Sequence, residues 1–161
     1  SSVDARTHEI ASALINLGLD QADIHQKLFD NNKESRLKLL GYCLSKKLEV
    51  LREYKTAIMS LSIEELDKFN FEKGDTEGFV NYALSINGIV FTAFFIQYDE
   101  KVKISFRSLK DFRANLLSVK HFNGGGHINA AGGMYEGTLE EAIAKLKKVL
   151  PEFKEELIAN C

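Results

Sequence analysis

Cysteine is scarce in this sequence of 161 residues, which contains only Cys43 and Cys161. Two cysteines so far apart predict neither a disulfide framework nor a zinc site. Long apolar runs are also missing, because the richest stretches, 89–96 and 139–150, fall well short of the ~18 apolar residues that a membrane-spanning helix needs. No apolar core follows Ser1, so the sequence indicates no signal peptide. We therefore expect a cytoplasmic protein that makes no contact with a membrane.

The sequence also lacks a strong net charge. Its formal charge is −2, which argues against a general binder of polyanions, and a composition of 45% hydrophobic and 27% charged residues is typical of globular proteins. The length suits about one domain with an extension.

The charge is nevertheless uneven along the chain. Between residues 101 and 127, six basic residues accompany one acidic residue, Asp111, and two histidines, His121 and His127. The basic residues are Lys101, Lys103, Arg107, Lys110, Arg113 and Lys120. A charge run is usually a solvated surface, but this one leads into a glycine stretch. Basic side chains beside glycine backbone favour a ligand that carries phosphate.

Three consecutive glycines, Gly124 to Gly126, precede His127 and form the most distinctive stretch of the sequence. Glycine has no Cβ atom, so its backbone accepts positive φ and its N–H groups approach an anion closely. The histidine ring donates a hydrogen bond or carries a charge near neutral pH. Glycine triplets also occur in flexible turns, and most lone histidines have no special role, so the triplet by itself leaves both interpretations open.

The longer string Gly-Gly-Gly-His-x-x-Ala-Ala-Gly, from Gly124 to Gly132, resembles the signature of the DHH-associated domain, the C-terminal substrate-binding half of the DHH phosphoesterases. The family usually has a fourth glycine where this chain has Asn123, a residue type that also tolerates left-handed backbone conformations. Ser105–Ser108 is similar to the Ser-x-Arg-Ser strand end that precedes the glycines in this family.

The resemblance covers most of the chain. Residues 76–81 and 86–90 look like the segment before the central strands of the family, and residues 6–20 resemble the last helices of the partner DHH domain. In length and spacing the chain is most similar to small members, some called exopolyphosphatase-related, that degrade short oligoribonucleotides and dephosphorylate 3′-phosphoadenosine 5′-phosphate. The resemblance implies that the chain is a fragment of a two-domain hydrolase.

The resemblance also assigns roles to parts of the protein. It implies that a missing N-terminal DHH domain holds manganese or magnesium, and that this chain alone binds no metal, has no catalytic residue and is inactive. The sequence agrees, since no histidine pairs with a carboxylate at metal-ligand spacing. The expected partner is a phosphorylated nucleotide or a short single-stranded RNA, and a homo-oligomer remains open.

For the site, the resemblance implies that Arg107 grips phosphate through its guanidinium group and that Ser108 adds a hydroxyl. The backbone of the glycine stretch and His127 would hold the same or a neighbouring phosphate. The expected substrate-binding residues are Arg107, Ser108, Asn123, Gly124, Gly125, Gly126, His127, Ala130, Ala131 and Gly132. Arg113 and His121 are expected to have no such role.

Two other hypotheses stay open. A similar glycine–histidine domain ends the alanyl-tRNA synthetases, so the chain could be an RNA-contacting module, and it could also be a plain interaction domain. The helices expected within residues 6–30 resemble the end of a DHH domain rather than an editing domain. They favour the phosphoesterase.

Hydrophobic periodicity predicts helices in the N-terminal third. Ile10, Leu14 and Leu17 lie on one face of a first predicted helix, which ends at Gly18. A second helix begins at Asp20 and ends by residue 32. Leucines recurring three and four residues apart then predict a long linker helix over residues 34–54.

Strands are expected at 56–61, 90–97, 102–107 and about 130–135, and the middle two form a hairpin. Capping boxes at Ser62–Glu65 and Thr138–Glu141 begin helices, the second of which Pro151 stops. Helices are also expected near 79–84 and within 112–122. This order predicts an α/β fold, a mixed β-sheet flanked by helices and preceded by an all-helical extension. The expected divisions are residues 1–32 (end of a truncated DHH domain), 33–55 (linker helix) and 56–161 (DHH-associated substrate-binding domain).

Overall fold

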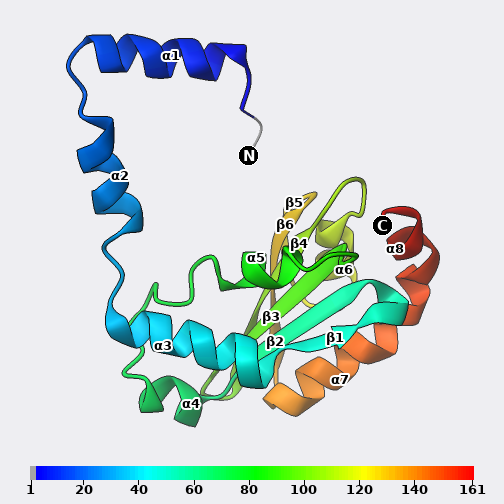
Figure 1. The fold of residues 1–161 in the computed structure, drawn as a ribbon. Coiled ribbons are helices and arrows are strands. Elements are labelled where there is room, and N and C mark those ends of the chain that lie inside the picture. Colours follow the sequence, from blue (N-terminus) through cyan, green and yellow to red (C-terminus); the bar gives the residue numbers. More distant parts are fainter. Residues whose placement is uncertain (1–2) are drawn as a thin grey trace. The chain divides into compact units, whose positions relative to one another are not determined.

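The structure is a computed structural model that describes residues 3–161, and these residues form two compact units that divide after Glu34. The first unit has two helices, α1 (Ala5–Asn16) and α2 (Gln21–Phe29), shown at the blue end of the chain in Figure 1. Asp4 and Asp20 cap them by accepting hydrogen bonds from the N–H groups three residues on. Gly18, between them, has φ +91°, as expected for the residue that ends the first helix.

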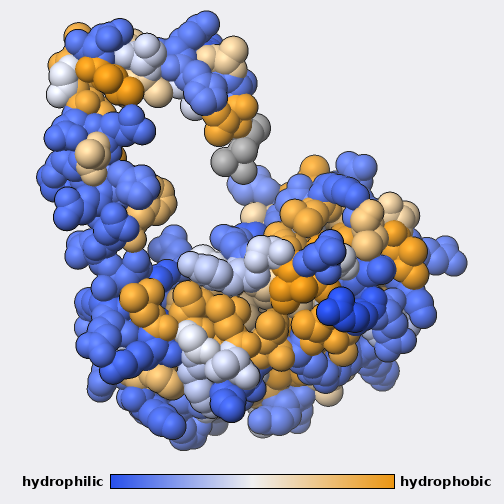
Figure 2. All heavy atoms as spheres, viewed as in Figure 1, coloured by the Kyte–Doolittle hydropathy of each residue, from blue (hydrophilic) through white to orange (hydrophobic). Residues whose placement is uncertain are grey.

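Every described residue of the first unit is exposed. Its apolar side chains stand among hydrophilic neighbours on the surface of α1 and α2, as Figure 2 shows. Ile10 and Leu14, on the apolar face predicted for the first helix, are 52 and 43% exposed, and Ile24 and Leu28 of α2 are 38 and 69% exposed. The first unit therefore has no buried core of its own.

The second unit is built on a six-stranded mixed sheet with strand order β1-β2-β3-β4-β6-β5. Strands β2 and β3 are parallel, because the chain crosses over between them through two helices, and all other neighbours are antiparallel. The strands are β1 (Glu49–Leu51), β2 (Thr56–Leu61), β3 (Phe91–Tyr98), β4 (Lys101–Ser108), β5 (Gly125–His127) and β6 (Ala130–Glu136). The predicted α/β class with a mixed sheet is confirmed.

Helices cover both faces of this sheet (Figure 1). One face packs against α3 (Glu34–Tyr42), α4 (Ile63–Lys68) and α5 (Phe79–Leu84), and the other against α6 (Ala114–His121), α7 (Leu139–Val149) and α8 (Lys154–Ala159). Short 3-10 turns at Arg52–Tyr54 and Leu150–Phe153 complete the chain. Phe94 of β3 stacks on Phe79 of α5 in the first layer, and Phe106 of β4 packs on Phe122 in the second. The two layers give the sheet a hydrophobic core on each side.

Both predicted capping boxes are present. Ser62 and Thr138 accept hydrogen bonds from the N–H groups of Glu65 and Glu141, whose carboxylates accept in return. Tyr42 also donates to Glu65, and Lys47 lies 2.9 Å from the same carboxylate. Burial would raise the pKa of Glu65, but the hydrogen bonds from Tyr42 and Ser62 hold this pKa below its ordinary value.

The predicted linker helix over residues 34–54 is wrong beyond Lys47. The chain leaves α3 through a π-helical turn, Cys43–Lys47, and then forms the edge strand β1. Val50 packs into the core layer of α3 to α5, whereas Leu51 packs into the opposite layer. Neighbouring residues that enter opposite faces show the period of a strand. The helical leucine spacing continues past the helix because Leu48 follows the π-helical turn and Leu51 belongs to β1.

Candidate substrate-binding site

Beyond α5, one face of the sheet is open over β4, β6 and β5. Opposed residues of antiparallel strands point to the same face, so the strand register sorts the side chains into rows. One row joins Arg107, Ala130 and His127, and the next joins Ser105, Gly132 and Gly125. A third pairs Lys103 with Met134. These eight residues are all exposed or half-buried, and we call this surface the basic face.

A groove of about 520 Å³ lies where the basic face meets the segment before α5. Lys103, Ser105 and Arg107 form its wall on β4, and residues from Phe71 to Val80 form the opposite wall. The size is within the range of small-ligand pockets, roughly 300–1,000 Å³. The groove therefore has room for a nucleotide-sized molecule.

The charges in this groove are mostly positive. Lys73, Lys103 and Arg107 line it together with one acidic residue, Glu77. Arg107 donates through Nη1 to the carbonyl oxygen of Phe106 at 2.9 Å, which orients the guanidinium group and leaves other donors free. Within residues 3–161, neither Lys103 nor Arg107 forms an ion pair with a carboxylate. An anion that enters the groove would therefore meet uncompensated positive charge.

The glycine stretch forms a hairpin, β5 paired with β6, and its glycines differ in role. A Cβ atom on Gly124 would lie 1.9 Å from the carbonyl oxygen of Gly132, and one on Gly126 would lie 2.6 Å from that of Ala130. These two glycines are required for close packing of the hairpin itself. A Cβ atom on Gly125 would meet nothing within 4 Å, so Gly125 leaves open space on the basic face. Asn123 has φ +47°, the left-handed conformation that its residue type tolerates.

Ser108 is placed differently from Arg107, although the two are adjacent. Its side chain is 4% exposed, and its hydroxyl donates to the carbonyl oxygen of Phe112 at 2.7 Å and accepts from Asn129 at 3.0 Å. Ala131 is also buried on that side of the sheet, packed against the core layer of α6 to α8. The structure thus places Ser108 and Ala131 beneath the site and Arg107, Ala130 and Gly132 upon it.

Asn129 is a residue that the sequence did not single out. Its side-chain amide donates to the hydroxyl of Ser108 and to the carbonyl oxygen of Lys110, both at 3.0 Å. Its backbone carbonyl accepts from the backbone N–H of Ser108. These bonds join the tip of the β5–β6 hairpin to the end of β4, which fixes the glycines relative to Arg107. The sequence signal that could have identified this residue is an asparagine in the two-residue turn between β5 and β6.

His127 is exposed at the edge of the basic face, and its ring has no hydrogen-bond partner within residues 3–161. Arg113 precedes α6 and is exposed, while His121 lies 3.4 Å from Glu152, away from the basic face. Within residues 3–161, no three or more His, Cys, Asp or Glu side chains gather in a group that could hold a metal ion. None of its described helices is long and apolar enough to cross a membrane.

Comparison with known proteins adds an independent finding. Residues 54–156 match the DHHA1 domain. The structure of an exopolyphosphatase-related protein from Bacteroides fragilis is 43% identical in sequence to this chain and superimposes on it with a TM-score of 0.92. The match covers 96% of this chain and 45% of the Bacteroides protein. PggH from Vibrio cholerae, a pGpG-specific phosphodiesterase, is 17% identical in sequence to this chain and shares its fold with a TM-score of 0.57. That match covers 100% of this chain and 54% of PggH. The chain thus spans about half the length of these structures. No curated protein matches it in sequence.

Proposed function

Since the chain belongs to the DHHA1 domain family, we propose that it is the substrate-binding part of a DHH-family phosphoesterase and binds phosphorylated nucleotides on its basic face. The proposed substrates are short oligoribonucleotides or nucleotide 3′,5′-bisphosphates. The 43% identity to an exopolyphosphatase-related protein supports the family of hydrolases, and the groove beside Arg107 supports the class of ligand.

The observation that carries this proposal is that Arg107 and Lys103 line a groove beside the glycine hairpin and, among the described residues, neither forms an ion pair with a carboxylate. Arg107 and His127 lie on the same face two strands apart, roughly 10 Å, and only the small side chain of Ala130 stands between them. A phosphate held by the guanidinium group would leave its ester oxygens within reach of the glycine backbone and the imidazole. Guanidinium and phosphate form short, bidentate hydrogen bonds.

The hydrolytic step is assigned to a part of the protein outside this chain. Manganese or magnesium there would neutralise phosphate charge and generate hydroxide. The residues of this chain would orient the nucleotide: Arg107 and His127 fix the phosphate, Gly125 and Gly132 let it approach the sheet, and Ser108 with Asn129 hold the hairpin in place. The chain alone is proposed to be inactive.

Calorimetric titration with adenosine 3′,5′-bisphosphate tests this proposal. Arg107→Ala should raise Kd by roughly 10- to 100-fold, because a hydrogen bond to a charged group contributes about 1.5–3 kcal/mol. Lys103→Ala should raise Kd only severalfold, since an exposed charge contributes about 1 kcal/mol or less. Lys148→Ala, on α7, is the control and should leave Kd unchanged.

Equal increases in Kd for Arg107→Ala and Lys103→Ala would contradict the proposed contact between Arg107 and phosphate. They would show that the basic residues attract the ligand only through their combined electrostatic field. Binding of a structured RNA in preference to the bisphosphate would overturn the proposal in favour of an RNA-contacting module.

A further inference from the structure

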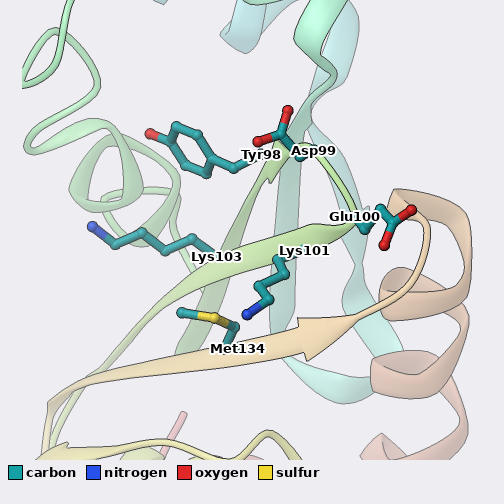
Figure 3. Close-up of a pocket in the computed structure, with 6 residues that line it drawn as sticks. All are labelled: Tyr98, Asp99, Glu100, Lys101, Lys103 and Met134. Carbon is teal, nitrogen blue, oxygen red and sulfur yellow. The ribbon is translucent and has the colours of Figure 1, made fainter.

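The groove is not the only hollow on the basic face. A second hollow of about 730 Å³ lies at the β3–β4 hairpin, lined by Tyr98, Lys103 and Met134 together with the hairpin residues Asp99, Glu100 and Lys101. Tyr98 and Lys103 line both hollows, so the two are adjacent. Figure 3 shows Tyr98, Lys103 and Met134 extending from neighbouring strands to the same side, with Glu100 set apart in the turn. The proposed phosphate site therefore continues along β4 toward this hairpin.

The spacing along β4 suits a chain of nucleotides. Alternate residues of a strand point to one face, so Arg107, Ser105 and Lys103 stand in a line with intervals of roughly 6.7 Å. Lys103 is then roughly 13 Å from Arg107 along the strand. That distance exceeds the roughly 3.4 Å rise per nucleotide of a stacked strand several times. A short oligonucleotide held at Arg107 therefore reaches the second hollow only if its backbone is extended and its bases are unstacked from one another.

The second hollow has the surfaces that a nucleobase requires. Tyr98 is 41% exposed and Met134 is 43% exposed, and no other ring within residues 3–161 packs against Tyr98. Burial of its inner part raises the pKa of Tyr98. The phenol is uncharged at neutral pH even without this shift. Flat aromatic rings beside positive charge are how proteins bind single-stranded nucleic acid without reading its sequence.

Resting on the proposed function, we propose that Tyr98, Lys103 and Met134 form a subsite for a later nucleotide of a single-stranded oligonucleotide whose first phosphate lies at Arg107. A base stacks on the ring of Tyr98 and contacts the thioether of Met134, and Lys103 contacts the intervening phosphate. Asp99 and Glu100 line the far rim of this hollow, where their negative charge disfavours a further phosphate. The subsite therefore selects oligonucleotides over mononucleotides and ends the bound stretch at the hairpin.

Two ligands test the subsite by calorimetric titration: adenosine 3′,5′-bisphosphate and the trinucleotide pApApA. The wild-type chain should bind pApApA more tightly than the bisphosphate. Tyr98→Ala should raise Kd for pApApA by about tenfold, because stacking of one base contributes roughly 1–3 kcal/mol, and should change Kd for the bisphosphate less than about twofold. Tyr98→Phe keeps the flat ring and should behave like the wild type. Tyr82→Ala removes a similarly exposed tyrosine on α5 and is the matched control.

Failure of the subsite and failure of the proposed function give different results. The subsite is overturned if the wild type binds both ligands equally, or if Tyr98→Ala changes both affinities by the same factor or neither. If the wild type binds neither ligand, the proposed function fails and the subsite fails with it. Loss of pApApA binding in Tyr98→Ala with the bisphosphate affinity retained supports the subsite.

Discussion

At the scale of single residues, the alternation of β4 separates two neighbours that the sequence places together. Arg107 points to the basic face, whereas Ser108 is buried and bonded to Phe112 and Asn129. The Ser-x-Arg-Ser string therefore combines a residue that faces the ligand with one that fixes the backbone behind it. A family string by itself cannot distinguish these two tasks, because it does not say which side of the strand each residue occupies.

The three glycines of the hairpin allow a prediction at the same scale. Gly124→Ala should lower the free energy of unfolding by about 2 kcal/mol or more, because its Cβ atom would overlap the carbonyl of Gly132 and overpacking typically costs 1–3 kcal/mol. Gly125→Ala should leave stability within about 0.5 kcal/mol of wild type, since its Cβ atom meets nothing, yet should weaken phosphate binding at least severalfold. Denaturant unfolding and titration with adenosine 3′,5′-bisphosphate measure the two effects. A Gly125→Ala protein with unchanged affinity would contradict the view that ligand approaches this position.

At the scale of elements, the two capping boxes offer a matched comparison. The carboxylate of Glu65 accepts from Ser62 and Tyr42 and lies beside Lys47, whereas that of Glu141 accepts from Thr138 at an exposed helix start. Glu65→Gln should lower the unfolding free energy by about 1–2 kcal/mol at pH 7. Glu141→Gln should lower it less.

The effect of Glu65→Gln depends on pH in a definite direction. A carboxyl whose pKa is lower in the folded state stabilises the fold above its unfolded value of 4.5, and this contribution disappears as pH falls through the folded pKa. The difference between the wild type and Glu65→Gln should therefore shrink below about pH 4.5 in urea unfolding experiments. A difference that stays constant from pH 7 to pH 3 would show that the hydrogen bonds to Glu65 do not depend on its charge.

The sequence predicted the central elements well because their signals are local. The apolar runs of β2 and β3 and both capping boxes occupy nearly the expected positions. The leucine spacing predicts a helix where strand β1 lies, since an edge strand of three residues carries too little periodicity to outweigh the leucines around it. Strand β5 is missing from the strands that the sequence predicts, because its three residues become a strand only by pairing with β6. Likewise the role of Asn129 follows only from the structure, which brings the tip of the β5–β6 hairpin within hydrogen-bond distance of Ser108 at the end of β4.

At the scale of the whole molecule, the described chain divides into a unit without a buried core and a unit with two. The chain also spans about half the length of the similar structures. The proposed binding function rests entirely on the second unit, where the basic face, the groove and the hollow at the β3–β4 hairpin adjoin one another. The side of the sheet that carries α6, α7 and α8 supports the site only from beneath, where Ser108 is bonded to Phe112 and Asn129.

The most direct test of this account is a map of amide chemical shifts across the ¹⁵N-labelled chain as adenosine 3′,5′-bisphosphate is added. The largest changes should occur at Ser105, Arg107, Gly125, His127 and Gly132, with little change in α7 and α8. Changes centred on α7 or α8, or no saturable change on the basic face, would contradict the claim that this surface binds a phosphorylated nucleotide.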